Sequence, residues 1–259
     1  MRVRLADVTL RRLGEAVTRR VRAIPDVLAW YGRSGRAARE RIARFRDCHR
    51  GKRAFVLGNG PSLAKTDLAR IAGEVTFGAN RIYLAHIPTY LTCVNELVLE
   101  QFRDEIRALD CPKFLNWNRR QLFDDDPFVA LELGLTDSFV TDATRQLSSG
   151  GTVTFVALQL AYYMGFREVV LLGVDHRFVD KGTPNRTETR TESVDQNHFH
   201  ASYFPKGSKW QLPDLRRSEL AYEKARRAFE RDGRRIVDAT IDGACTVFEK
   251  ASFDDVVRR

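Results

Sequence analysis

The stretch RAFVLGNGPSL (residues 53–63) determines the fold of this chain. Its first half is a short run of apolar, β-branched and aromatic residues, which is typical of a buried strand. The run ends at Gly58, Asn59 and Gly60, and Pro61 follows. Because proline fits the first turn of a helix without losing a hydrogen bond, a helix is expected to begin there. The sequence therefore predicts a strand, a tight turn and a helix, the unit from which parallel α/β sheets are built.

The same alternation continues along the chain. Strands are expected at 53–58, 74–78, 89–94, 113–116, 138–141, 168–174 and 235–239, and helices at 61–72, 96–109, 152–164 and 214–232. This pattern predicts an α/β fold with a doubly wound, mostly parallel, Rossmann-like sheet that has helices on both faces. The domain should span about 51–250. Within it, residues 178–213 contain few apolar side chains, so they are expected to form a long lid.

Composition excludes several classes of protein. The chain has 259 residues, of which 43% are hydrophobic, and this is enough for one large domain or two small ones. No apolar run approaches eighteen residues, so a membrane-spanning protein is not expected. The four cysteines show neither a CxxC pattern nor the spacing of zinc ligands. Together with the lack of a recognisable secretory signal, they predict a reduced, cytoplasmic location.

The positive charge is concentrated in an N-terminal extension, residues 1–50. This part holds 14 Arg, no Lys and five acidic residues, so its net charge of +9 equals that of the whole chain. Between Val3 and Val21 apolar residues recur at three- and four-residue steps, which predicts a basic amphipathic helix. Such a helix can lie on an anionic membrane surface or dock on the protein's own body. No nucleic-acid-binding module accompanies it, so nucleic acid is not an expected partner.

Polar side chains follow most of the predicted strands at the point where each strand ends. Besides the turn at Asn59, Asn80 follows the second strand, Asn95 the third, Asn116 the fourth and Asp175 the sixth. In open α/β sheets the ligand binds outside the carboxyl ends of the strands. Each asparagine alone could be a turn or a helix cap. Their recurrence predicts a ligand site at this edge.

Two loops are candidates for binding a phosphate. Glycines allow a close approach of the backbone, and the free N–H groups at a helix start attract anions. Neither a Walker A loop nor a GxGxxG motif is present, and a plain strand-to-helix turn is the alternative. Two such loops would suit a nucleoside diphosphate, or a nucleoside monophosphate joined to an acidic sugar. The residues expected to bind are Gly58, Asn59, Gly60, Pro61 and Ser62 in the first loop and Ser148, Ser149, Gly150 and Gly151 in the second.

Four motifs together resemble a known superfamily. They are GNGPSL (58–63), GANRIYL (78–84), SSGG (148–151) before a helix, and GFREVVLLGVD (165–175). In this order they resemble the superfamily of the archaeal 6-hydroxymethyl-7,8-dihydropterin pyrophosphokinase-like (MptE-like) domains, the motility accessory factors implicated in flagellin glycosylation, and the bacterial lipooligosaccharide sialyltransferases. The resemblance covers about 52–248.

The sialyltransferase branch implies roles for particular residues. By this resemblance Asn59, Asn80, Asn95 and residues 148–151 would bind the nucleotide. A histidine would act as general base without a metal, and tyrosines would steady the departing phosphate. This chain has Arg177 where one such tyrosine is expected. Arg177 could neutralise the phosphate by charge instead.

The histidines of the lid are the candidates for the base. In DQNHFHASYF (195–204), His198 and His200 are two residues apart, so in an extended segment both would point to one side. Either could deprotonate a sugar hydroxyl, with Asp195 as an orienting partner. The expected catalytic set is His198 or His200 with Arg177 and Asp175. Alternatively, these histidines could bind a divalent metal together with acidic neighbours, or be purely structural.

These observations predict a transferase that uses an activated phosphate donor. The leading hypothesis is a glycosyltransferase that uses a nucleotide-sugar donor, such as a CMP-activated acidic sugar, and a glycan or lipid-linked acceptor in bacterial surface glycan synthesis. It would need no metal or cofactor and would work in the cytoplasm, at the inner face of the membrane. One alternative is an ATP- and Mg²⁺-dependent pterin diphosphokinase. Another is a nucleotide-binding domain without catalysis. The oligomeric state is left open.

Overall fold

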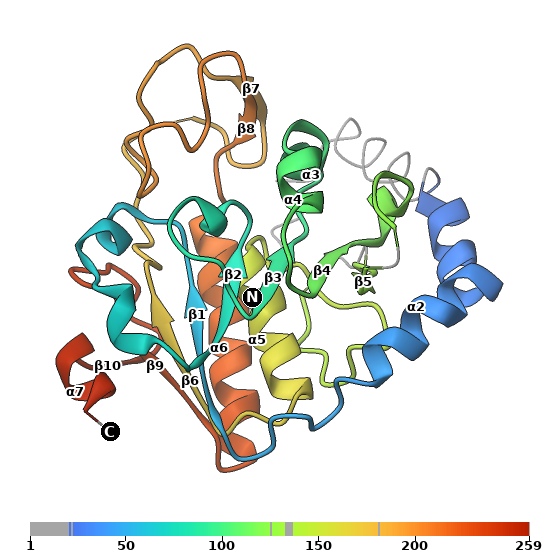
Figure 1. Cartoon of the computed structure of the whole chain (residues 1–259), viewed down its shortest axis with the longest axis horizontal. Coiled ribbons are helices and arrows are strands. Elements are labelled where there is room, and N and C mark those ends of the chain that lie inside the picture. Colours follow the sequence, from blue (N-terminus) through green and yellow to red (C-terminus); the bar gives the residue numbers. More distant parts are fainter. Residues whose placement is uncertain (1–20, 22, 125, 133–136, 181, 259) are drawn as a thin grey trace, which may run out of the picture.

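The computed structural model describes residue 21 and residues 23–124, 126–132, 137–180 and 182–258. Its centre is an eight-stranded sheet with the order β10-β9-β6-β1-β2-β3-β4-β5 (Figure 1). All of its strand pairs are parallel, so the predicted α/β, Rossmann-like architecture is confirmed. The strands are β1 (Arg53–Leu57), β2 (Val75–Ala79), β3 (Tyr90–Cys93), β4 (Lys113–Asn116), β5 (Phe128–Val129), β6 (Glu168–Leu172), β9 (Arg235–Asp238) and β10 (Glu249–Lys250).

The order of the strands reverses at β1. From β1 to β5 the chain moves to one side, and β6 then pairs with the other side of β1, with Ala54 opposite both Val75 and Val169. The connections on the two sides of this reversal lie on opposite faces of the sheet, because crossovers between parallel strands are right-handed. A crevice is therefore expected where the carboxyl ends of β1 and β6 meet.

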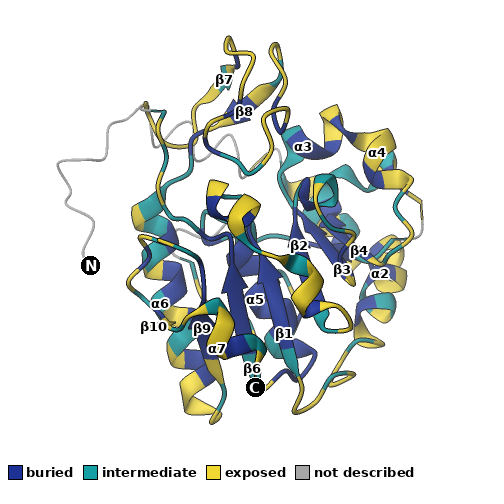
Figure 2. Ribbon diagram, turned by 60° about the vertical axis from the view of Figure 1, so that its left-hand side comes forward, coloured by how far each residue is buried: buried dark blue, intermediate teal, exposed yellow. Residues whose placement is uncertain are grey.

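The two faces of the sheet are covered differently. Helices α5 (Val153–Tyr163) and α6 (Leu215–Arg231) pack on one face, where α5 contacts β1, β2 and β3 (Figure 2). The other connections use 3₁₀ helices, η2 (Pro61–Lys65) and η3 (Leu68–Ile71) among them. One helix over 61–72 was expected. It is divided because Asp67 accepts a hydrogen bond from Ala69 N and starts a new helical turn.

Further short helices continue this pattern. The segment predicted as one helix over 96–109 consists of α3 (Glu96–Gln101) and α4 (Arg103–Arg107), with a break at Phe102, whose φ is −121°. The remaining short elements are η4 (Ile82–Leu84), η5 (Trp117–Leu122) and α7 (Phe253–Val257).

The prediction of a strand at 138–141 is wrong. The fifth strand is β5, which pairs with β4. The N–H groups of Ser138 and Val140 instead donate to side chains, the hydroxyl of Ser148 and the amide oxygen of Gln159. Side-chain acceptors thus replace the neighbouring strand, and sequence periodicity does not reveal them.

The N-terminal extension belongs to the body from residue 23 onward. Residues 23–31 are helical, and α2 (Arg33–Ala43) lies beside β5. Trp30 is fully buried and meets Trp117 edge to face, with ring centroids 5.3 Å apart. The basic helix predicted over 3–21 lies almost wholly outside the described residues. Within the described part of the chain, no helix is long and apolar enough to cross a membrane.

The predicted lid at 178–213 stands over the carboxyl edge of the sheet (Figure 1). It is mostly irregular, with one antiparallel pair formed by β7 (Thr187–Thr189) and β8 (Lys209–Gln211). Many of its residues are exposed, whereas the strands below are buried (Figure 2). It is anchored by three buried aromatic side chains, Tyr203, Phe204 and Trp210.

Candidate functional site

A cavity of about 590 Å³ lies at the carboxyl edge of the sheet, between the strand ends and the lid. The five strand-end positions predicted to meet a ligand all line it, and so do lid residues from the other side. The polar lining residues from the strand ends are Asn59, Asn80, Asn95, Asn116 and Asp175. The crevice at the strand reversal is therefore a real cavity, and the fold rule identifies it as the candidate ligand site.

The asparagines divide into two kinds. Asn95 and Asn116 cap α3 and η5, since their Oδ1 atoms accept from Leu97 N and Asn118 N, both at 3.0 Å. Asn59 donates to the carbonyl of Ala79 at 3.0 Å. Among the described residues, the buried Oδ1 atoms of Asn59 and Asn80 have no partner. A buried acceptor without a donor is unfavourable, so a ligand that donates hydrogen bonds would stabilise these two side chains.

The glycine turn does not offer the free N–H groups that were expected. Gly58 N donates to the carbonyl of Leu172 at 2.7 Å, and Gly60 N donates to that of Gly173 at 2.9 Å. At the helix start, Ser62 donates from its N to Asp175 Oδ1 at 3.1 Å and from its Oγ to Oδ2 at 2.6 Å. The carboxylate of Asp175 therefore already occupies the position that was predicted to bind a phosphate.

This contact gives Asp175 and Gly60 structural roles. A Cβ on Gly60 would lie 1.9 Å from Asp175 Oδ2, so only glycine lets the carboxylate reach the turn. Gly58, Asn59 and Gly60 line the cavity, whereas Pro61 and Ser62 are not among its lining residues. The first loop thus contributes its backbone and Asn59 to the site, but not its helix start.

The second loop is also occupied by a carboxylate. Asp137 accepts hydrogen bonds from Gly150 N and Ser148 Oγ, both at 3.0 Å, and Arg217 holds it through two contacts of 2.7 and 2.8 Å. Burial raises the pKa of Asp137, but the hydrogen bonds from Arg217, Ser148 and Gly150 together with the charge of Arg217 outweigh it, so the pKa lies below its ordinary value. Ser149 and Gly151 line the cavity. Of the four predicted residues in this loop, these two can meet a ligand in this arrangement.

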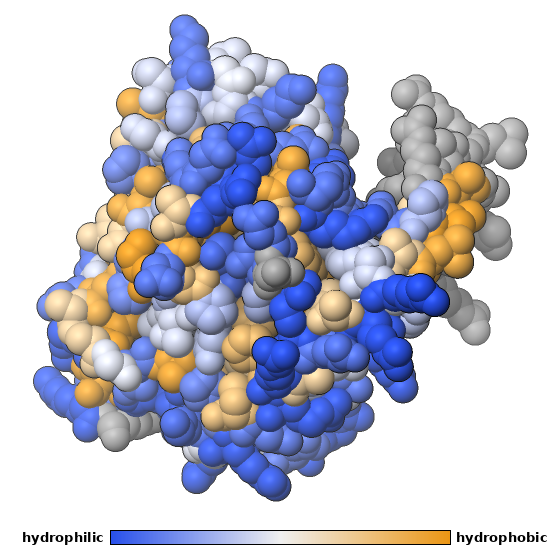
Figure 3. All heavy atoms as spheres, turned by 45° about the vertical axis from the view of Figure 1, so that its right-hand side comes forward, coloured by the Kyte–Doolittle hydropathy of each residue, from blue (hydrophilic) through white to orange (hydrophobic). Residues whose placement is uncertain are grey.

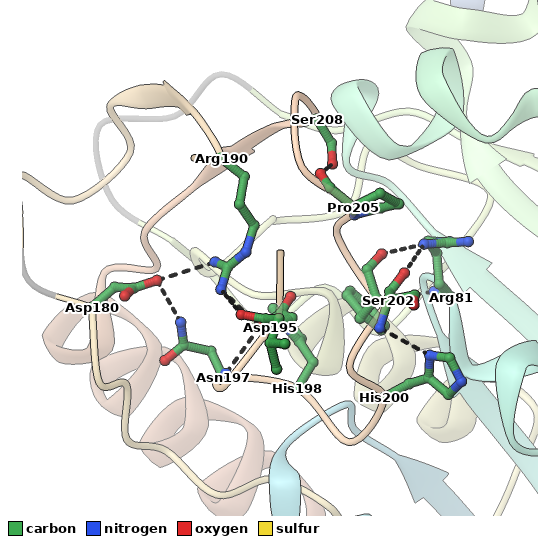
Figure 4. A network of polar contacts seen from close by, with 12 residues as sticks. Arg81, Asp180, Arg190, Asp195, Asn197, His198, His200, Ser202, Pro205 and Ser208 are labelled. Carbon is green, nitrogen blue, oxygen red and sulfur yellow. Dashed lines mark hydrogen bonds and ion pairs between the residues drawn. The ribbon is translucent and has the colours of Figure 1, made fainter. Parts of the chain in front are cut away.

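His198 forms a pair with the buried Asp195 in the lid (Figure 4). His198 Nδ1 lies 2.8 Å from Asp195 Oδ2, and the carboxylate is fully buried while the histidine lines the cavity. Because an ionised carboxylate only accepts, Nδ1 carries the proton and the lone pair is on Nε2. This arrangement presents a proton acceptor to the cavity.

The carboxylate is held in its ionised form by its neighbours. Burial raises the pKa of Asp195, but the hydrogen bonds from His198 and Asn197 and the charge of Arg190 outweigh it, so the pKa lies below its ordinary value. Asp195 also accepts from Asn197 N at 2.9 Å. Asn197, His198 and Arg190 all present N–H groups to this carboxylate.

His200 does not share this position. The segment around it consists of bends and turns rather than a strand, so the expectation that both histidines point to one side is wrong. His200 is exposed, accepts from Ser202 N at 3.2 Å, and is not among the residues that line the cavity. Of the two candidate histidines, His198 lines the cavity and His200 does not.

Two buried arginines that the sequence did not single out fasten this segment (Figure 4). Arg190 contacts Asp180 at 3.2 Å and Asp195 at 3.7 Å. Arg81 donates to the carbonyls of Ser202 and Tyr203. The Tyr203 ring in turn stacks on His198, with centroids 4.0 Å apart. Arg81 lies within GANRIYL, but nothing in that motif signals a contact 122 residues away.

The remaining candidate residue is Arg177. Arg177 is exposed and donates to the carbonyl of Asp242, and it lines the cavity. Arg119 and Arg217, which the sequence did not single out, also line it. In the described ranges no group of three or more His, Cys, Asp and Glu side chains is arranged to hold a metal ion.

Comparison with known proteins does not assign the chain to a family. No protein-family model matches the chain, and no curated protein is significantly similar to it.

Proposed function

We propose that this protein is a glycosyltransferase that uses a nucleotide-activated sugar, resembling the sialyltransferases in its motifs. The observation that carries the proposal is the Asp195–His198 pair, in which the carboxylate is buried and the histidine lines the same cavity as the β1–β6 crevice. A donor would lie over the strand ends, and an acceptor would approach beneath the lid. The cavity volume lies within the range of small-molecule sites.

The proposed reaction is a displacement at the anomeric carbon. An acceptor hydroxyl oxygen forms a bond to that carbon while the bond from the carbon to the phosphate oxygen breaks. His198 Nε2 takes the hydroxyl proton, and the departing nucleotide keeps the electron pair. Asp195 stabilises the imidazolium that forms, since its negative charge lies 2.8 Å from Nδ1. Arg177 lines the cavity as a source of positive charge for the leaving phosphate.

The donor class is tested by thermal unfolding in the presence of CMP, UDP, GDP or ATP, each with and without Mg²⁺. A nucleotide at about 100 times its Kd adds about 2.7 kcal/mol to the stability of the folded state. Stabilisation by a pyrimidine monophosphate without Mg²⁺ is expected. Stabilisation by ATP with Mg²⁺ alone would favour the pterin diphosphokinase, and no effect of any nucleotide would refute the proposal.

The base is tested with a matched pair of histidine variants. His198→Ala should lower turnover of a CMP-activated acidic sugar by about 10²–10⁴-fold. His200→Ala should leave turnover unchanged, because His200 is exposed and lies outside the cavity lining. Equal turnover in the two variants would remove His198 from its proposed role.

A further inference from the structure

The N-terminal helix exposes an apolar stripe. Among the described residues, few large hydrophobic side chains are exposed, and half of those belong to one face of this helix. Val21, Ile24, Leu28 and Tyr31 are 57%, 51%, 67% and 59% exposed and follow one another at steps of three, four and three residues. Figure 3 shows apolar side chains gathered on this part of the surface. We call these four residues the stripe.

The protein's own body cannot cover the stripe by rotating the helix, because the opposite face is already packed. Trp30 is fully buried against Trp117, whose Nε1 donates to the carbonyl of Asp26 at 2.9 Å. The Asp26 carboxylate also contacts Arg120 at 2.6 Å. Turning the stripe inward would expose Trp30 and break both polar contacts. The stripe therefore needs a partner outside the described body.

The charge around the stripe specifies the partner. Residues 1–50 hold a net charge of +9, all of it from arginine, whereas the rest of the chain is neutral. Arg33 and Arg36 follow the stripe directly and are exposed. An apolar helical stripe within a strongly basic segment is typical of helices that lie in the headgroup region of an anionic membrane. We propose that the stripe docks this protein on an anionic lipid surface.

The stripe helix is also connected to the candidate site. Trp117 and Arg120, which hold the helix, belong to η5. Arg119 of the same short element lines the cavity. Docking through the stripe therefore brings a lipid surface close to one side of the cavity, where a lipid-linked molecule could be reached. The docking itself does not depend on the proposed reaction.

The test is sedimentation of the full chain with phosphatidylcholine vesicles, with and without phosphatidylglycerol. Binding is expected to the anionic vesicles and should be lost at about 1 M salt, where the Debye length falls to about 3 Å. The variant Ile24→Glu/Leu28→Glu should weaken binding by at least about tenfold. The control Ile87→Glu/Leu220→Glu changes two other exposed apolar residues, 55% and 41% exposed, and should bind like the unmodified protein.

Several results would overturn the proposal. Equal binding to neutral and anionic vesicles, or an equal loss in both variants, would do so. Light scattering that shows a dimer, converted to a monomer by Ile24→Glu/Leu28→Glu, would identify a second copy of this chain as the partner. A lowered melting temperature of that variant without vesicles would show that the stripe packs within its own chain.

Discussion

Replacing Asp195 with asparagine tests the central pair of the site. The side chain keeps its shape, but one carboxylate oxygen becomes an NH₂ group. His198 and Asn197 both donate to this carboxylate, at 2.8 and 2.9 Å, and Arg190 lies 3.7 Å away. In either orientation the new amide therefore points N–H at another donor. If it faces His198, it favours the other tautomer, whose Nε2 carries a proton and cannot accept one.

The magnitude follows from the burial of the carboxylate. A hydrogen bond to a charged group contributes about 1.5–3 kcal/mol, and Asp195 has no exposed side-chain surface. Losing one such bond and placing the new N–H against a donor should lower the unfolding free energy by about 3 kcal/mol. Urea denaturation measures this directly, and turnover of the donor should fall in parallel. A loss of less than about 1 kcal/mol would refute the reasoning.

Asp180 provides a matched control. It contacts the same arginine at 3.2 Å, but 37% of its side chain is exposed. Water reaches the Asp180 carboxylate and screens its charge, so Asp180→Asn should cost less than about 1 kcal/mol. A loss as large as that of Asp195→Asn would mean that the ion pair to Arg190, and not the pair with His198, accounts for the effect.

The difference in stability between the wild type and Asp195→Asn should depend on pH. The folded pKa of Asp195 is lowered, so its ionisation stabilises the fold fully above its unfolded pKa, about 3.9. This stabilisation is lost as the pH falls through the folded value. The difference in unfolding free energy between the wild type and Asp195→Asn should therefore stay constant above about pH 5 and shrink below it. A difference that grows on acidification would contradict the sign.

Two further substitutions test contacts of the glycine turn and of the lid around the cavity. Gly60→Ala places a Cβ 1.9 Å from Asp175 Oδ2. We expect the unfolding free energy, measured in urea, to fall by about 2–3 kcal/mol, and the thermal stabilisation by nucleotides to be lost. An unchanged unfolding free energy would show that the turn relaxes freely. Arg81→Lys keeps the charge but cannot reach both carbonyls of residues 202 and 203, so limited proteolysis should cut the lid faster while the sheet stays intact. An unchanged cleavage rate would mean that the lid does not depend on Arg81.

The local sequence predicted most of the strands, because buried parallel strands are short apolar runs that need no distant information. It also predicted that Asn59, Asn80, Asn95, Asn116 and Asp175 would share one edge. These residues meet because the carboxyl ends of parallel strands lie at the same edge of the sheet. The strand at 138–141 failed for the opposite reason. Its N–H groups are satisfied by the side chains of Ser148 and Gln159, and apolar periodicity carries no information about such contacts.

Only the tertiary structure decided how the charged groups pair. From the sequence, the helix starts at Pro61 and Thr152 were open to an anion. In the structure, Asp175, which is 113 residues from Ser62, and Asp137, which is 13 residues from Gly150, occupy the nearby anion positions. Likewise, the two lid histidines were equivalent in the sequence, and the turn that buries Asp195 separated them. Strand and helix propensities depend on neighbouring residues, whereas charge pairing depends on which groups the fold brings within about 3 Å of each other.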